Sequence, residues 1–162
     1  MADAYLDAVM SVYQGEVLGE SMFSGLLAAA ASKHQPYFAA MLQMETEAKA
    51  MLRPLLMRRG LSIVESETWR QEGYGHAARL GALSWPDFLR VFIEEIRVYV
   101  DRYQGFADQA PPEDRDALLA MVEHEKSFIR FAEAAQQGKP AEALAALTSQ
   151  LKVQLPIASE YI

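Results

Sequence analysis

The chain has 162 residues, 51% hydrophobic and 23% charged, and this length and balance predict one folded domain spanning residues 1–162. Its formal net charge of −7 disfavours a nucleic-acid partner, because phosphate backbones repel acidic proteins. The absence of cysteine excludes disulfides, thiolate metal sites and thiol catalysis, so any metal must bind Glu, Asp or His. Residues 1–7 lack a basic signal segment, and no apolar run reaches the roughly 20 residues of a membrane span. We therefore expect a soluble cytoplasmic protein without a membrane partner.

Helix-forming residues dominate the chain, and no stretch alternates apolar and polar residues for long enough to form a strand. The sequence therefore predicts an all-α fold. Prolines near helix starts and glycines just past helix ends mark the boundaries. The expected helices cover residues 4–32, 36–60, 67–80, 84–109, 113–138 and 140–151.

The lengths of the connections predict the topology of the four long helices. Helices 4–32 and 36–60 are joined by only a few residues, as are helices 84–109 and 113–138, so each pair should form an antiparallel hairpin. The segment 61–84 is long enough to run back along a helix of about 35 Å, at about 1.5 Å per residue. The second hairpin can therefore start beside the first, which predicts a four-helix bundle with one long crossover and a short C-terminal helix.

Four ligand-competent side chains interrupt the apolar stripes of the long helices near their midpoints. They are Glu16, Glu45, Glu95 and His124, one from each helix. On the third long helix, a step of three residues from Phe92 selects Glu95 as the inward-facing acid. The interval from Glu16 to Glu45 equals that from Glu95 to His124, so both hairpins should carry their polar pair at the same height.

Three buried carboxylates in one layer need compensation, because burying each ionised group costs several kcal/mol and like charges repel. A cation would supply it directly. Oxygen ligands with one imidazole suit iron or manganese, with zinc possible. Protonation is the other route, since burial and neighbouring carboxylates raise carboxyl pKa values.

Across residues 4–137, these positions resemble the ferritin-like di-metal carboxylate superfamily. In that family a Glu from each of two helices combines with a Glu-x-x-His motif from each of the other two. The resemblance rests on Glu16, Glu45, Glu95 and His124. It implies a ferritin-like bundle that holds one or two iron or manganese ions. It also implies oxygen activation or oxidation of a small-molecule substrate.

The chain departs from the family pattern at two positions. Three residues after Glu45 it has Ala48 instead of His, and three residues before His124 it has Met121 instead of Glu. Two nearby acids could substitute for the missing ligands: Glu20 and Glu125. The missing ligands predict that one metal ion is bound more readily than two.

Two functions without redox chemistry remain as alternatives to an iron- or manganese-dependent oxidoreductase. One is a binding or storage protein that holds an ion or small ligand. The other is a structural protein whose acids are protonated or paired with cations, Glu45 with Lys49 and Glu95 with Arg102.

The C-terminal segment 153–162 is apolar, and Pro156 prevents it from continuing a helix. Such surface is commonly buried by self-association. We therefore expect the segment to dock on a bundle groove and the protein to form a homodimer.

Overall fold

A computed structural model describes residues 2–154 of the chain. Over this range the chain forms six α-helices and one 3₁₀ turn and contains no strand, which confirms the all-α prediction. The elements are α1 (Ala2–Ala29), η1 (Ser32–His34), α2 (Gln35–Arg58), α3 (Glu67–Gly81), α4 (Trp85–Gln109), α5 (Pro112–Gln136) and α6 (Pro140–Thr148). These bounds lie close to the expected ones, except that α1 and α6 each end three residues early. After α1 the chain turns through η1 instead of extending the helix.

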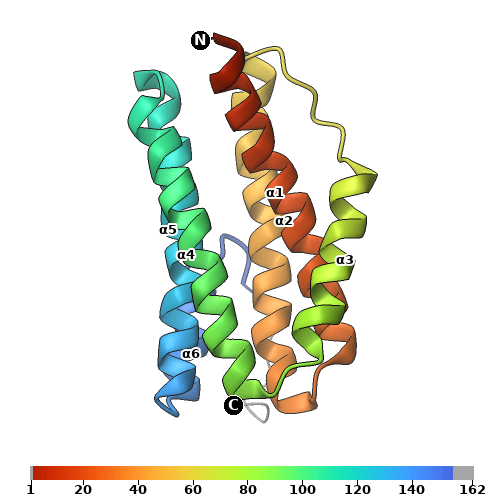
Figure 1. Ribbon diagram of the computed structural model, residues 1–162. Helices are drawn as coiled ribbons and strands as arrows, with labels where there is room; N and C mark the ends of the chain where they lie inside the picture. The colour runs from red at the N-terminus through yellow and green to blue at the C-terminus, as the bar shows by residue number, and fades with distance from the viewer. Residues whose placement is uncertain (1, 155–162) are drawn as a thin grey trace.

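The four long helices α1, α2, α4 and α5 lie side by side as two antiparallel hairpins (Figure 1). Helices α2 and α4 both run from the bottom of the view to the top, so the second hairpin starts at the same end as the first. This is the arrangement that the long connection between them predicts. The short helix α6 lies at the lower end, packed on α5.

The crossover contains helix α3, which packs on the outer side of α1 (Figure 1). Ser66 caps its N-terminus, because its hydroxyl oxygen accepts the backbone N–H of Trp69. Gly73 allows the close approach, since a Cβ there would lie 1.9 Å from Ser21 Oγ and 2.2 Å from the Leu18 carbonyl oxygen. Ser21 Oγ then donates a hydrogen bond to the Arg70 carbonyl. The crossover is therefore fixed against the first hairpin.

The two hairpins are joined at the upper end by the buried carboxylate of Asp114, at the start of α5. It accepts hydrogen bonds from Arg58 and Arg59 at the end of α2 and from the Tyr5 hydroxyl on α1. One carboxylate thereby links three helices.

The apolar core consists of two clusters separated along the bundle axis. One cluster contains Phe23 of α1, Met41 of α2 and Phe128 of α5. The other contains Val12 of α1, Leu52 of α2 and Leu118 of α5. On each of these helices a polar residue lies between the two clusters, so the core is interrupted at one level.

The last described residues return to the side of α2. The backbone N–H groups of Lys152 and Val153 donate hydrogen bonds to the Glu47 carboxylate at 2.6 and 2.9 Å. The expected docking concerns segment 153–162, of which residues 155–162 lie outside the described residues. No helix within 2–154 has both the length and the apolar character that crossing a bilayer requires.

Candidate metal centre

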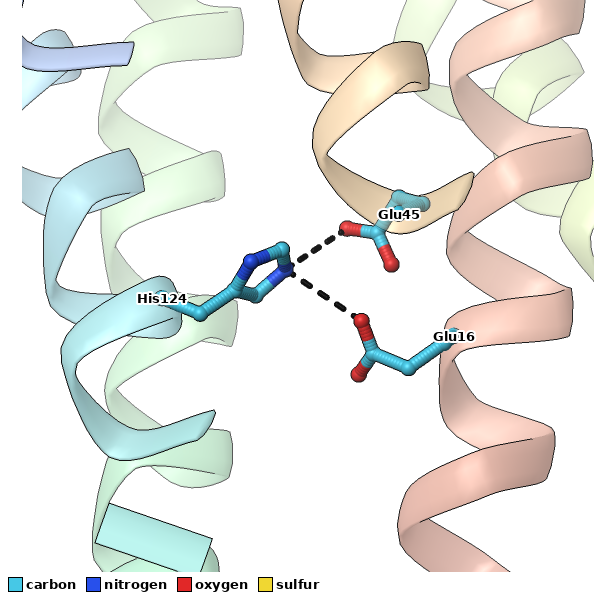
Figure 2. Close-up of side chains that lie close together, drawn as sticks. All are labelled: Glu16, Glu45 and His124. Carbon is cyan, nitrogen blue, oxygen red and sulfur yellow. Dashed lines mark hydrogen bonds and ion pairs between the residues drawn. The ribbon is translucent and has the colours of Figure 1, made fainter. Parts of the chain in front are cut away.

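Three of the four residues selected by sequence meet at the level where the core is interrupted. Glu16 reaches this level from α1, Glu45 from α2 and His124 from α5 (Figure 2). One atom of each side chain lies within 4.8 Å of the other two. All three residues are buried, with exposed fractions of 1%, 3% and 6%. The apolar stripes place them there, since each occupies an inward position of its helix.

The geometry leaves one carboxylate oxygen without a hydrogen bond. His124 Nε2 lies 3.3 Å from Glu45 Oε1 and 3.2 Å from Glu16 Oε2 (Figure 2). An imidazole nitrogen carries at most one hydrogen, so it cannot donate a well-directed bond to both oxygens. Glu16 Oε2 is buried and accepts no hydrogen bond from the described residues. Such an atom requires another positive or donating group.

The three groups shift one another's protonation. Burial raises the pKa of Glu45 well above its usual range, and the neighbouring Glu16 raises it further. For His124, burial alone lowers the pKa, but the charges of Glu16 and Glu125 and the contact with Glu16 outweigh it, so the pKa is raised overall. Both shifts indicate excess negative charge in a poorly solvated place.

The nearest lysine is occupied elsewhere. The buried Lys49 ammonium lies one turn beyond Glu45 on α2, but it pairs with Glu20 at 2.9 Å and also with Glu65. Glu65 pairs in turn with Arg70. The alternative pairing of Glu45 with Lys49 is therefore absent from the described residues, and this network compensates its own acids.

Glu95 does not join the cluster. Its side chain is 39% exposed, and its carboxylate pairs with Arg79 of α3 at 2.9 Å instead of the expected Arg102. The inward stripe of α4 steps four residues from Phe92 to Ile96, whereas the sequence prediction stepped three. Both steps fit a helix of 3.6 residues per turn, and burial of the apolar Ile96 decides between them. Arg79 reaches Glu95 because the crossover helix α3 packs nearby. The position of α3 cannot be predicted from the helical period of α4.

Glu125 is a buried acid that the sequence suggested only as a substitute ligand. It is 5% exposed and lines a cleft between α1 and α4 that also reaches Glu45 and Glu95. Burial raises its pKa well above the usual range, and the charge of Glu16 adds to this effect. Tyr103 lines the same cleft, and burial raises its pKa well above 10.

The donor atoms fit a single first-row metal ion. Two ligand atoms, each about 2.1 Å from one ion, lie roughly 3.0 to 3.5 Å apart, which brackets the two separations from His124 Nε2. Two carboxylates and one imidazole suit iron or manganese and also accept zinc. On another side of the imidazole there is space, because Ala48, Met121 and His124 line a second cavity of about 100 Å³.

No family model matches this chain, and neither a curated protein nor a solved structure matches it. The case for a metal centre therefore depends on the geometry and burial of these side chains.

Proposed function

We propose that this chain is a ferritin-like metal-binding protein in which Glu16, Glu45 and His124 hold one iron or manganese ion. The observation that carries the proposal is Glu16 Oε2, a buried carboxylate oxygen with no hydrogen bond from the described residues. A cation between the three side chains would contact this oxygen and the second carboxylate together, which one imidazole hydrogen cannot do. Two hairpins joined by a long crossover, with inward ligands from facing helices, support the ferritin-like assignment.

We further propose that the protein is an oxidoreductase acting on a small molecule. A bound iron or manganese ion would supply the redox chemistry. The chain's own contribution is an apolar surrounding that excludes water and a cleft that reaches Glu45 from the α1–α4 side. Ala48 and Met121 replace two of the family's ligands, which favours one ion per chain over two.

The alternative is a non-catalytic binding or structural protein in which protonation replaces the metal. The raised pKa of His124 favours it, because an imidazolium between Glu16 and Glu45 would neutralise part of their charge. The raised pKa of Glu45 lets that carboxyl hold a proton as well.

Metal analysis of protein purified without chelator separates the two proposals. We expect about one equivalent of iron or manganese per chain. Glu16→Gln and His124→Ala should each lose most of it, since each removes one of three ligands. Glu95→Gln is the matched control, because this acid lies outside the cluster and should leave the metal content unchanged. A content near zero in the wild-type protein supports the non-catalytic alternative.

Redox activity needs a separate measurement. Addition of ferrous iron without oxygen, followed by air, should produce a new near-ultraviolet or visible absorption band that Glu16→Gln lacks. If the protein contains one equivalent of metal but its spectrum does not change on exposure to air, the metal-site proposal stands and the oxidoreductase proposal is rejected.

A further inference from the structure

The cleft between α1 and α4 has a mainly apolar wall to which four helices contribute. Among its residues are Leu18 and Phe23 of α1, Leu80 of α3, Phe92 and Ile96 of α4, and Phe128 of α5. Its volume is about 50 Å³, whereas one water needs roughly 10 to 15 Å³. The cleft can therefore hold a molecule of a few non-hydrogen atoms.

Two glycines on α1 keep the inner end of the cleft open. A Cβ at Gly15 would lie 2.7 Å from Tyr103 Oη, and a Cβ at Gly19 would lie 2.6 Å from Glu45 Oε2. These residues are one helical turn apart, so both clear the same face of α1. Space is left beside the Glu45 carboxylate and the Tyr103 hydroxyl.

Three carboxylates line the cleft, and they differ in whether another group already binds them. Glu45 belongs to the proposed metal centre, and Glu95 is compensated by Arg79, which also contacts His76 Nδ1 at 2.9 Å. Glu125 is 5% exposed and makes no hydrogen bond or ion pair with any residue between 2 and 154. The polar end of the cleft therefore offers one buried carboxyl group free to bind a ligand.

The chemistry of this lining selects a class of ligand. Within the described part of the chain, His76 is the only basic residue that lines the cleft, so a carboxylate or phosphate group would find no Lys or Arg to pair with there. An ammonium group would make charge-assisted hydrogen bonds with Glu125 and would be attracted by the neighbouring rings of Tyr99 and Tyr103. The apolar walls suit a hydrocarbon part.

We propose that the α1–α4 cleft binds a small apolar amine, with its ammonium group on the Glu125 carboxylate and its hydrocarbon part against the apolar wall. To call this amine the substrate rests on the proposed function, because the cleft reaches Glu45 of the metal centre. Binding of the amine itself can be measured with or without metal.

Three probes with equal numbers of non-hydrogen atoms test the class: butylamine, 1-butanol and propionate. Titration of the full-length protein at pH 7.5, followed by calorimetry or ligand NMR, should give at least tenfold tighter binding for butylamine than for 1-butanol. Propionate should not bind. Equal affinity for butylamine and 1-butanol, or measurable binding of propionate, would overturn the proposal.

Two substitutions locate the bound amine. Glu125→Gln should weaken butylamine binding about tenfold, the loss expected for one charge-assisted hydrogen bond, and leave 1-butanol unchanged. Gly15→Ala should weaken the binding of both butylamine and 1-butanol. Gly105→Ala on α4 is the matched control, since a Cβ there meets nothing within 4 Å, and it should bind both probes as the wild type does. Unchanged butylamine binding by Glu125→Gln would place the amine elsewhere and reject the proposal.

Metal analysis of the same samples keeps this proposal separate from the proposed function. Glu125→Gln should retain the wild-type metal content. If that variant loses its metal, Glu125 is a ligand of the ion and the amine site is rejected while the metal centre stands. If the wild-type protein contains no metal and still prefers butylamine, the cleft stands as an amine site and the metal proposal fails.

Discussion

Glu16 Oε2 lies 3.2 Å from His124 Nε2 but accepts no hydrogen bond from any residue in the described part of the chain. The atom is buried beside a second carboxylate, Glu45, whose oxygen shares the same imidazole nitrogen. A buried, uncompensated carboxylate lowers stability by several kcal/mol. A cation bound between Glu16, Glu45 and His124 would offset this cost.

Manganese should stabilise the wild-type protein. At a concentration 100 times the dissociation constant, binding adds about 2.7 kcal/mol to the free energy of unfolding. For a chain of this size that raises the melting temperature by roughly 5 to 10 °C. Calorimetry with manganese chloride, compared with chelated protein, measures the increase.

Glu16→Gln should abolish the increase and raise the melting temperature of the chelated protein, because the buried charge is gone. Glu95→Gln should respond to manganese as the wild type does, and a loss of response there would add Glu95 to the ligands.

The stability of the chelated protein should fall as pH rises from about 5 to 8. A carboxyl group whose pKa is raised by folding binds its proton more tightly in the folded state, so stability is lost as pH rises from its unfolded pKa through the raised value. This applies to Glu45 and Glu125, and to His124 above pH 6.5, since its pKa is also raised. Urea midpoints at several pH values measure the slope.

The control for this pH dependence is the double variant Glu45→Gln with Glu125→Gln, which should flatten the slope. Carboxyl groups with lowered pKa values, such as Glu20 and Asp114, act in the opposite sense, but their contribution is lost only as pH falls below about 4.5. A midpoint that increases steadily between pH 5 and 8 would contradict the expectation.

Introducing His at position 48 and Glu at position 121, as in the ferritin-like pattern that the sequence resembles, should create a second metal position. Ala48 and Met121 line the cavity of about 100 Å³ beside His124, so Ala48→His together with Met121→Glu places new ligands next to the existing three. We expect the manganese content to rise from about one to about two ions per chain by elemental analysis. Ala48→Ser with Met121→Leu, which adds no strong ligand, should leave the content at one. A double ligand variant that still binds one ion contradicts this expectation.

Asp114 should be a main determinant of stability at the upper end of the bundle. Its side chain is fully buried and accepts hydrogen bonds from Arg58, Arg59 and Tyr5. Asp114→Ala removes the shared acceptor and should lower the free energy of unfolding by about 3 kcal/mol, measured by urea denaturation. Glu113→Ala removes an exposed neighbour and should cost less than about 1 kcal/mol. If the two variants lose the same free energy of unfolding, Asp114 is not a main determinant of stability.

The homodimer expected from sequence stays a prediction. Light scattering of the full-length protein should give twice the chain mass, because the apolar segment 153–162 needs cover. Deletion of residues 155–162 should give a monomer if that segment forms the interface. If the deletion variant is still a dimer, the interface lies elsewhere. If the full-length protein is a monomer, the homodimer prediction is wrong.

Much of the fold could be predicted from the sequence, because it depends on local properties. Helix periodicity and terminal prolines and glycines located the helices to within about three residues. The lengths of the connections predicted that α2 and α4 run in the same direction. The inward positions of Glu16, Glu45 and His124 followed from the apolar stripes on their helices.

Only the tertiary structure decided the fourth position and the cleft. A helical stripe permits steps of three or four residues, so Glu95 and Ile96 were both compatible with the period, and packing of Ile96 against the neighbouring helices selected it. Arg79 holds Glu95 outward because α3 packs on α1, a contact that no local pattern encodes. The cleft exists because Gly15 leaves space opposite Tyr103 of α4 and Gly19 leaves space opposite Glu45 of α2. Such space depends on how separate helices approach one another, which sequence periodicity does not determine.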